Sequence, residues 1–352
     1  MWATRLWWVS STTTAVALTA VPALAQPAEA LPERWASLQT TAQTHASYKV
    51  RATAVVALGR TPAVHRVQVL SAIEDRLQHD AHYAVRAAAA SALGALQEPG
   101  GVMPLMRALD DSEALVRRHA QRALLKFHQP KHLLAFRDLL NDAHTQRRLQ
   151  AHDAYRAVFL QGESSAGFAI LMGLDDDGEA IPRKHREALR TAPMELVGDV
   201  LQRGVRAGSA QVRTTCYEVL AERPDAQFAG ALVEQLFDGS ELGDARAALH
   251  KALRAHQAHL PVDKWRADSV ADDKAAQKDG LMGLAVLQDP SLAAAAKKAI
   301  VSGDPAVRTA AARALATAAD DASMRLLKGA HRRESDARTK RQMERLLRTA
   351  KR

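Results

Sequence analysis

The sequence predicts an all-α solenoid, an elongated stack of about ten two-helix repeats that forms a right-handed superhelix. Three observations predict it: a short sequence word recurs about every 32 residues, an apolar stretch precedes most copies, and prolines or acidic turns separate the units. Periods of roughly 20 to 50 residues are typical of solenoids, in which each unit packs only on its neighbours. We therefore expect one elongated body in place of separate globular domains.

The recurring word predicts the second helix of each repeat. It consists of an apolar residue, a basic residue, small residues four and seven positions after the first, and then Leu; 85–93 reads VRAAAASAL. These positions lie on one face of a helix, and small residues on that face let a neighbouring helix approach closely. The basic position of the word recurs at 51, 86, 117, 148, 185, 213, 246, 278, 308 and 340.

The apolar stretches before the word predict the first helix of each pair. They occupy 67–77, 102–109, 133–140, 168–174, 228–237 and 292–301. Acidic or polar turns follow many of them, and such residues cap the N-terminus of the next helix. Prolines, which suit helix starts and junctions, stand between the units at Pro62, Pro99, Pro130, Pro224 and Pro290.

The N-terminal residues do not follow the repeat pattern. Arg5 is the only charged residue before Glu29, an apolar stretch follows it, and Ala23 to Ala25 supply small residues where a signal peptidase cuts. This pattern predicts a secretory signal peptide over 1–25, an N-terminal capping helix over 26–44 and the solenoid over 45–352. The expected location is periplasmic or secreted, with no membrane span after cleavage. Cleavage at Ala30, or retention of the segment as an anchor, stays open.

Composition constrains the chemistry and the partners. The formal charge of +9 favours an anionic partner: a protein with an acidic surface, an anionic envelope polymer or nucleic acid. The single cysteine, Cys216, falls on a small position of the word, so we expect a buried, inert thiol. The 14 histidines form pairs without a complete zinc set, and no phosphate loop or catalytic triad stands out. We therefore predict no catalytic, metal or cofactor-binding residues.

The repeat units resemble the HEAT-repeat family, in particular its short bacterial, phycobilisome-lyase-type form. The resemblance covers roughly 45–350 and is carried by Asp80 before Val85-Arg86, Asp111 before Val116-Arg117, and Asp304-Pro305 before Val307-Arg308. It implies that arginines and aspartates form a ladder between neighbouring repeats. The ladder residues that it implies are Arg51, Arg86, Arg117, Arg213, Arg246, Arg308, Asp80, Asp111 and Asp142.

A second set of arginines is the candidate binding surface. If the word faces the core, the positions two and six residues after its start point away from it, onto the surface that is concave in such repeats. In the third to fifth units and the last helix, these positions or their neighbours carry Arg118, Arg122, Arg156, Arg186, Arg190, Arg341, Arg345 and Arg348. The alternative is a solvated face that is partly paired with nearby acids.

These observations favour an exported, non-catalytic scaffold or adaptor that binds another protein through its repeat surface. A lyase-type enzyme subunit is an alternative that rests on the resemblance, and a binder of anionic polymer or nucleic acid is another. Nucleic acid is the less expected partner, because export removes the chain from the genome and only Trp35 and Trp265 follow the leader. The identity of the partner, the binding face and the oligomeric state stay open.

Overall fold

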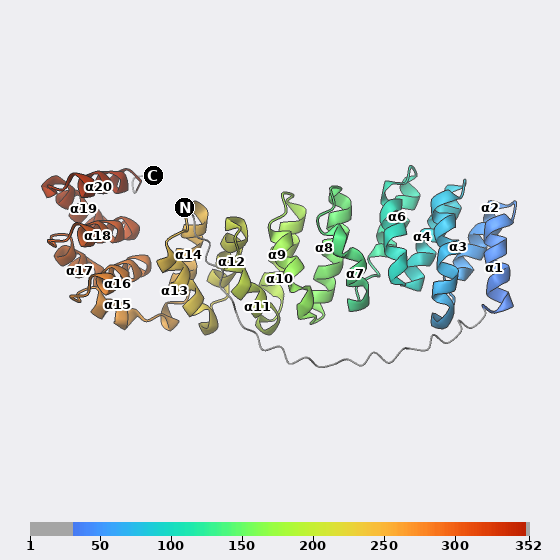
Figure 1. The fold of residues 1–352 in the computed structure, drawn as a ribbon, viewed down its shortest axis with the longest axis horizontal. Helices are drawn as coiled ribbons and strands as arrows, with labels where there is room; N and C mark the ends of the chain where they lie inside the picture. The colour runs from blue at the N-terminus through green and yellow to red at the C-terminus, as the bar shows by residue number, and fades with distance from the viewer. Residues whose placement is uncertain (1–30, 350–352) are drawn as a thin grey trace, which may run out of the picture.

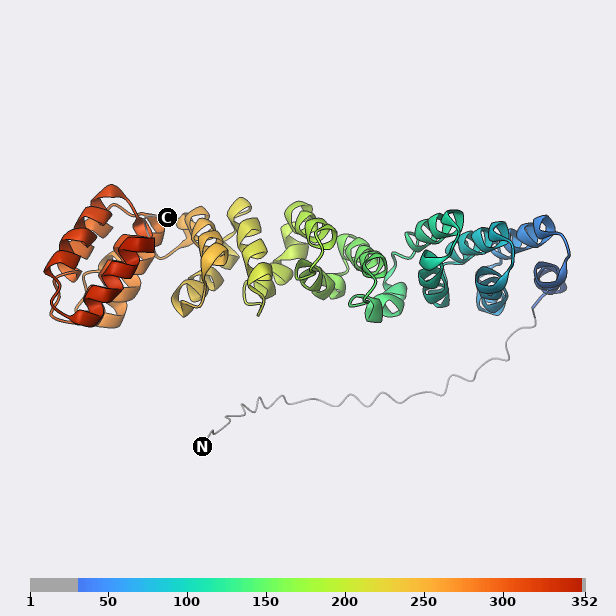
Figure 2. The ribbon, with the colours of Figure 1, turned by 90° about the horizontal axis from the view of Figure 1, so that it is seen from above.

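The computed structural model describes residues 31–349, and this part of the chain consists of helices and turns without a strand. Its 20 α-helices form ten consecutive pairs, which run as one elongated row from α1 to α20 (Figures 1 and 2). The prediction of an α-solenoid of about ten two-helix repeats is confirmed. The predicted signal peptide lies outside the described residues.

The first member of each pair is called the A helix. The A helices are α1 (Glu33–Thr44), α3 (Arg66–His79), α5 (Val102–Arg107), α7 (Leu133–Phe136), α9 (Gly167–Leu174), α11 (Met194–Gly204), α13 (Ala229–Asp238), α15 (Val262–Asp268), α17 (Leu292–Ala299) and α19 (Asp321–Arg333). Two of the predicted A helices are broken: α5 and α7 end early and continue as 3-10 turns over Ala108–Asp110 and Arg137–Leu139.

The second member of each pair, the B helix, carries the recurring word. The B helices are α2 (Tyr48–Leu58), α4 (Tyr83–Leu96), α6 (Ala114–Leu124), α8 (Thr145–Leu160), α10 (Ala180–Thr191), α12 (Ala210–Glu222), α14 (Gly243–Ala255), α16 (Lys274–Leu287), α18 (Pro305–Ala318) and α20 (Ala337–Thr349). On α4 the word positions Val85, Ala89 and Leu93 are fully buried. The word therefore faces the core, as its spacing predicts.

Small residues let successive B helices approach closely. On α4, a Cβ atom built on Gly94 would lie 2.6 Å from the Cβ atom of Ala123 on α6. Real Cβ atoms do not come this close, so the spacing between the two helices requires a glycine here. The alanine-rich composition thus sets the packing distance within the stack.

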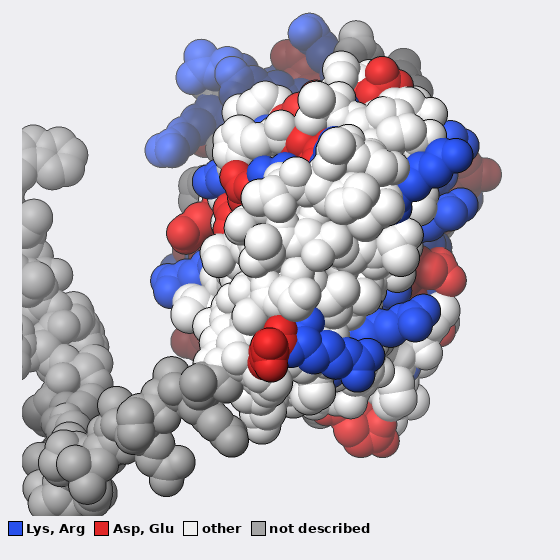
Figure 3. All heavy atoms as spheres, turned by 90° about the vertical axis from the view of Figure 1, so that its right-hand side faces the viewer, with Lys and Arg blue, Asp and Glu red and all other residues white. Residues whose placement is uncertain are grey.

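The row changes direction after α14. In Figure 1 the helices from α2 to α14 stand upright in the view, whereas α16, α18 and α20 run across it. Seen from the α1–α2 end, the centre of the face is uncharged and the charged side chains lie around its rim (Figure 3). The side chains Val50 and Val56 of α2 are partly exposed.

Candidate protein-binding surface

Arginines of the word join neighbouring repeats by ion pairs, most of them bidentate, here called rungs. In the rung between α4 and the turn before α6, Nε of Arg86 lies 2.8 Å from Oδ2 of Asp111 and Nη2 lies 3.0 Å from Oδ1. The remaining nitrogen, Nη1, donates to the backbone carbonyl of Asp80 at 3.0 Å. One guanidinium thus holds its own turn and the turn of the next repeat.

Four more arginines of the described residues pair with an acid 26 to 29 positions later, with an Nε–carboxylate distance of 2.6 to 2.8 Å. Three of them also bond the second carboxylate oxygen through Nη2, whereas Arg148 bonds one oxygen of its acid. The pairs are Arg51–Asp80, Arg148–Asp176, Arg213–Glu241 and Arg308–Glu334. The carboxylates are nearly buried, and the aspartates also accept the backbone N–H two residues further on, as Asp80 does from His82. The Arg308 hydrogen bonds, more than any other cause, hold the pKa of Glu334 below its usual value.

Three of the ladder residues that the resemblance implies do not form rungs, and for them the prediction is wrong. Nη1 of Arg117 donates to the carbonyls of Asp111 and Ser112, and no carboxylate among the described residues pairs with this guanidinium. Asp142 instead accepts from the backbone of His144, and Arg147 pairs with Asp110 across this junction. The reason is that the short α7 changes the step between the third and fourth repeats.

The third exception is Arg246, whose Nε donates to the carbonyl of Glu241 within its own repeat. It precedes the change of direction after α14, and no carboxylate among residues 31–349 forms an ion pair with it. The implied ladder contains only aspartates as acids, whereas two of the observed partners are the glutamates Glu241 and Glu334. Arg148 forms a rung although the sequence word around it is degenerate. Its position in the repeat period is the sequence signal that indicates this rung.

The arginines predicted to form a basic face lie on B helices but are not a continuous cationic surface. Arg118 and Arg122 are exposed, and neither has an ion-pair partner among residues 31–349. Three others are paired with acids, namely Arg156 with Asp153, Arg190 with Glu222 and Arg348 with Glu344. Arg186 lines a small cavity beside Glu218 and Asp244, and Arg341 and Arg345 are exposed on α20.

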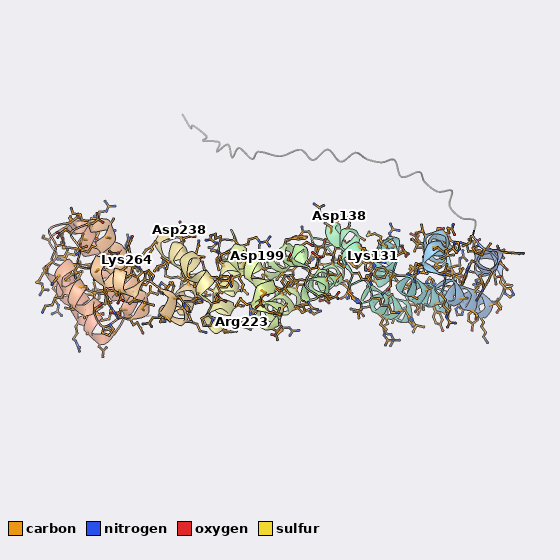
Figure 4. All side chains as sticks on the ribbon, turned by 90° about the horizontal axis from the view of Figure 1, so that it is seen from below. Lys131, Asp138, Asp199, Arg223, Asp238 and Lys264 are labelled. Carbon is orange, nitrogen blue, oxygen red and sulfur yellow. The ribbon has the colours of Figure 1, made fainter. Side chains whose placement is uncertain are left out.

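Charges of both signs also occur along the A-helix side. Figure 4 shows Asp138, Asp199 and Asp238 spread along the solenoid, with Lys131 near one end of this series and Lys264 near the other. This side therefore presents a surface of mixed charge, in which Lys264 pairs with Asp268.

A larger hollow, here called the C-terminal groove, lies where the row changes direction. It has a volume of about 790 Å³ and is lined by the end of α13 and by α16, α18 and α20. A second cavity of about 390 Å³ adjoins it, shares Leu236, Met282 and Arg313 with it, and extends to α14. The two form one groove across four B helices. No sequence pattern predicts this groove, because its walls come from positions more than 100 residues apart.

The floor of the C-terminal groove is apolar. Leu236 is buried, Met282 and Ala310 are half-buried, and Leu346 of α20 continues this surface. Phe237 stands at the edge with 36% of its surface exposed and packs edge-on against Trp265, with ring centroids 6.2 Å apart. An apolar floor with an exposed aromatic edge is typical of surfaces that bind protein segments.

Other titratable side chains are buried within the repeats. His152 and His185 form a buried pair, 3.1 Å between ring nitrogens. Burial raises the pKa of the Cys216 thiol to about 12. Residues 31–349 hold no cluster of three or more His, Cys, Asp or Glu placed to bind a metal ion. None of the helices in this range has the length and hydropathy that a membrane crossing requires.

Comparison with known proteins identifies the repeat type. Residues 70–156 match the model of the HEAT repeats. A search of curated proteins found no significant match.

Solved structures of repeat proteins are similar at low identity. An engineered protein is 17% identical, with a TM-score of 0.30, over 90% of this chain and 99% of that one. The complex of CpcE and CpcF of phycocyanin lyase from Nostoc sp. PCC7120 is 18% identical, with a TM-score of 0.31, over 77% of this chain and 97% of that one. Kap121p bound to Pho4p is 14% identical, with a TM-score of 0.39, over 90% of this chain and 41% of that one.

The family match and the helical pairs agree on the architecture. The matched range begins in α3 and ends in α8, and the same A–B pairing continues on both sides of it. The chain is therefore an α-solenoid, and residues 70–156 of it match the model of the HEAT repeats.

Proposed function

We propose that the chain is an exported, non-catalytic scaffold that binds another protein through its B-helix surface. The C-terminal groove is the observation that carries this proposal: it is large, has an apolar floor and lies on the B helices. An extended surface of this kind suits a long partner segment better than a small substrate. The expected location is the periplasm or the exterior, and its support is the leader-like sequence of residues 1–25.

Site-specific photo-crosslinking in the native host tests the binding. A photoreactive amino acid is placed at Thr309 or Gln342 in the groove, at Gln121 beside the exposed arginines of α6, and at Ala294 or Lys328 on A helices. Distinct crosslinked proteins at B-helix positions, absent from the A-helix positions, would support the scaffold. A pattern without any specific crosslink at all five positions would contradict it.

Export is tested separately by the mass of the mature chain. A protein recovered from the envelope or the medium that starts at Gln26 or Leu31 supports cleavage after Ala25 or Ala30. A chain found in the cytoplasm with Met1 retained contradicts export and leaves protein binding as a separate question.

A further inference from the structure

The acids that line the C-terminal groove mostly have partners within the protein, whereas three of its cationic side chains have none among residues 31–349. Among its carboxylates, Oδ2 of Asp304 lies 2.8 Å from Nζ of Lys274. Glu241 forms an ion pair with Arg213. Asp336 accepts the backbone N–H of Thr339 at 2.7 Å. These acids already serve the fold, so they are not available to a partner.

The groove cations are, in contrast, free. Lys278, Arg313 and Arg338 line the main cavity from α16, α18 and α20, and no side chain among residues 31–349 hydrogen-bonds or pairs with them. Arg313 also lines the adjoining cavity, which places it at the centre of the groove. Asp279 is the one lining carboxylate left without a partner in this part of the chain. Three free cations thus face one free carboxylate.

The cations line the same groove as the apolar floor. Met282 lies one helical turn after Lys278 on α16, and Ala310 lies one turn before Arg313 on α18. Apolar residues and free cations are therefore neighbours on two helices of the groove. A ligand that satisfies both must carry carboxylates and apolar side chains in the same short stretch.

We propose that the C-terminal groove binds an acidic, amphipathic segment of a partner protein, with carboxylates on Arg313, Arg338 and Lys278 and an apolar side chain on the floor beside Met282. This proposal deepens the proposed scaffold function and rests on it. Guanidinium groups favour carboxylates because their donors match both oxygens. A purely ionic polymer would leave the floor in contact with water, which makes it the poorer occupant.

Peptide binding to the purified chain tests the occupant. The probe is a fluorescent ten-residue peptide that alternates Glu with Leu and Phe, and its two controls replace either every Glu by Gln or every apolar residue by Ser. The amphipathic acidic peptide is expected to bind at least about tenfold more tightly than either control. Equal binding of the Glu-Ser peptide or of poly-glutamate would show a simple polyanion site and overturn the proposal.

Matched variants locate the binding. Arg313→Glu is expected to lower the affinity for the amphipathic peptide at least about tenfold, and Met282→Ser to lower it several-fold. Lys297→Glu makes the same change of charge at an exposed site on α17 and is expected to leave binding unchanged. Circular dichroism checks that the variants fold. An equal loss in Arg313→Glu and Lys297→Glu would mean that only net charge matters, which also overturns the proposal.

The photo-crosslinking separates this proposal from the scaffold function. Crosslinks at Gln121 without crosslinks at Thr309 and Gln342 would retain a scaffold and reject the groove. Absence of crosslinks at every position would reject the scaffold, whatever the peptide does in solution.

Discussion

Arg86 and Asp111 join α4 to the turn before α6 through two hydrogen bonds of 2.8 and 3.0 Å. Asp80, whose carbonyl accepts from Arg86, pairs through its own carboxylate with Arg51 of the preceding repeat. Each acid therefore links one arginine through its side chain and the next through its backbone. The connection runs from α2 to α6 and ends at Arg117, which has no carboxylate partner in the described part of the chain.

The first prediction concerns the stability that a rung supplies. Arg86→Ala should lower the free energy of unfolding by about 2 to 3 kcal/mol, because it leaves the largely buried Asp111 without its cation. Arg117→Ala removes only bonds to backbone carbonyls and should cost about 1 kcal/mol. Urea denaturation of both variants at neutral pH measures the difference. Equal losses would mean that the carboxylate adds nothing to the stack.

The second prediction concerns the pH dependence of stability. Burial, followed by the charges of His152, Arg156 and Lys184, lowers the pKa of His185 from 6.5 to about 3. Between these two pH values the unfolded chain binds a proton on His185 and the folded chain does not. The contribution of neutral His185 to the free energy of unfolding is therefore present in full above pH 6.5 and decreases as the pH falls.

The measurement is the melting temperature of the wild type and of His185→Gln from pH 7 to pH 4. The variant should begin from a lower melting temperature and show a clearly shallower decline on acidification. A decline as steep as that of the wild type would place the titration elsewhere.

The third prediction concerns the thiol. Cys216 is fully buried on α12, and its pKa is raised to about 12 by burial, so almost no thiolate exists at pH 8. A thiol reagent such as Ellman's reagent should leave the native protein unmodified and react once urea unfolds it. Ala294→Cys, at an exposed position of α17, should add one thiol that reacts in the native state. Rapid modification of the native wild type would show that α12 opens readily.

The fourth prediction concerns helix spacing. Gly94→Ala should destabilise the stack by about 1 to 3 kcal/mol, because the new methyl group would overlap Ala123. Gly230 is also helical but has nothing within 4 Å of an added Cβ atom, so Gly230→Ala should stabilise the protein by about 0.5 to 1 kcal/mol. Thermal unfolding compares the two. A neutral Gly94→Ala would mean that α4 and α6 can move apart at little cost.

The sequence predicts the repeats well because each depends on local periodicity. The word that begins at Val85 and the burial of Leu93 follow from helical spacing and the need for a core. The rungs at Asp80 and Asp111 follow from the same period. Asp142 stands 25 residues after Arg117, as Asp111 does after Arg86, yet pairs elsewhere. Whether an acid meets its arginine depends on the rotation between repeats, which the packing of the A helices sets.

The groove depends still more on such rotations. Leu236 and Gln342 line one cavity only because the row changes direction after α14. No periodic signal in either segment records that change. The predicted basic face assumed that all repeats follow one regular path, and several of its arginines are instead neutralised by acids such as Asp153 and Glu222.

The rungs that are missing at Arg117 and Arg246 have a mechanical consequence. A bidentate ion pair resists torsion between two repeats, whereas apolar packing alone yields to it more readily. Twisting forces on the solenoid will thus be relieved more readily at joints without a rung, including these two. The joint at Arg246 adjoins the C-terminal groove. A partner bound in the groove would therefore change the orientation of the last three repeats relative to the rest of the solenoid.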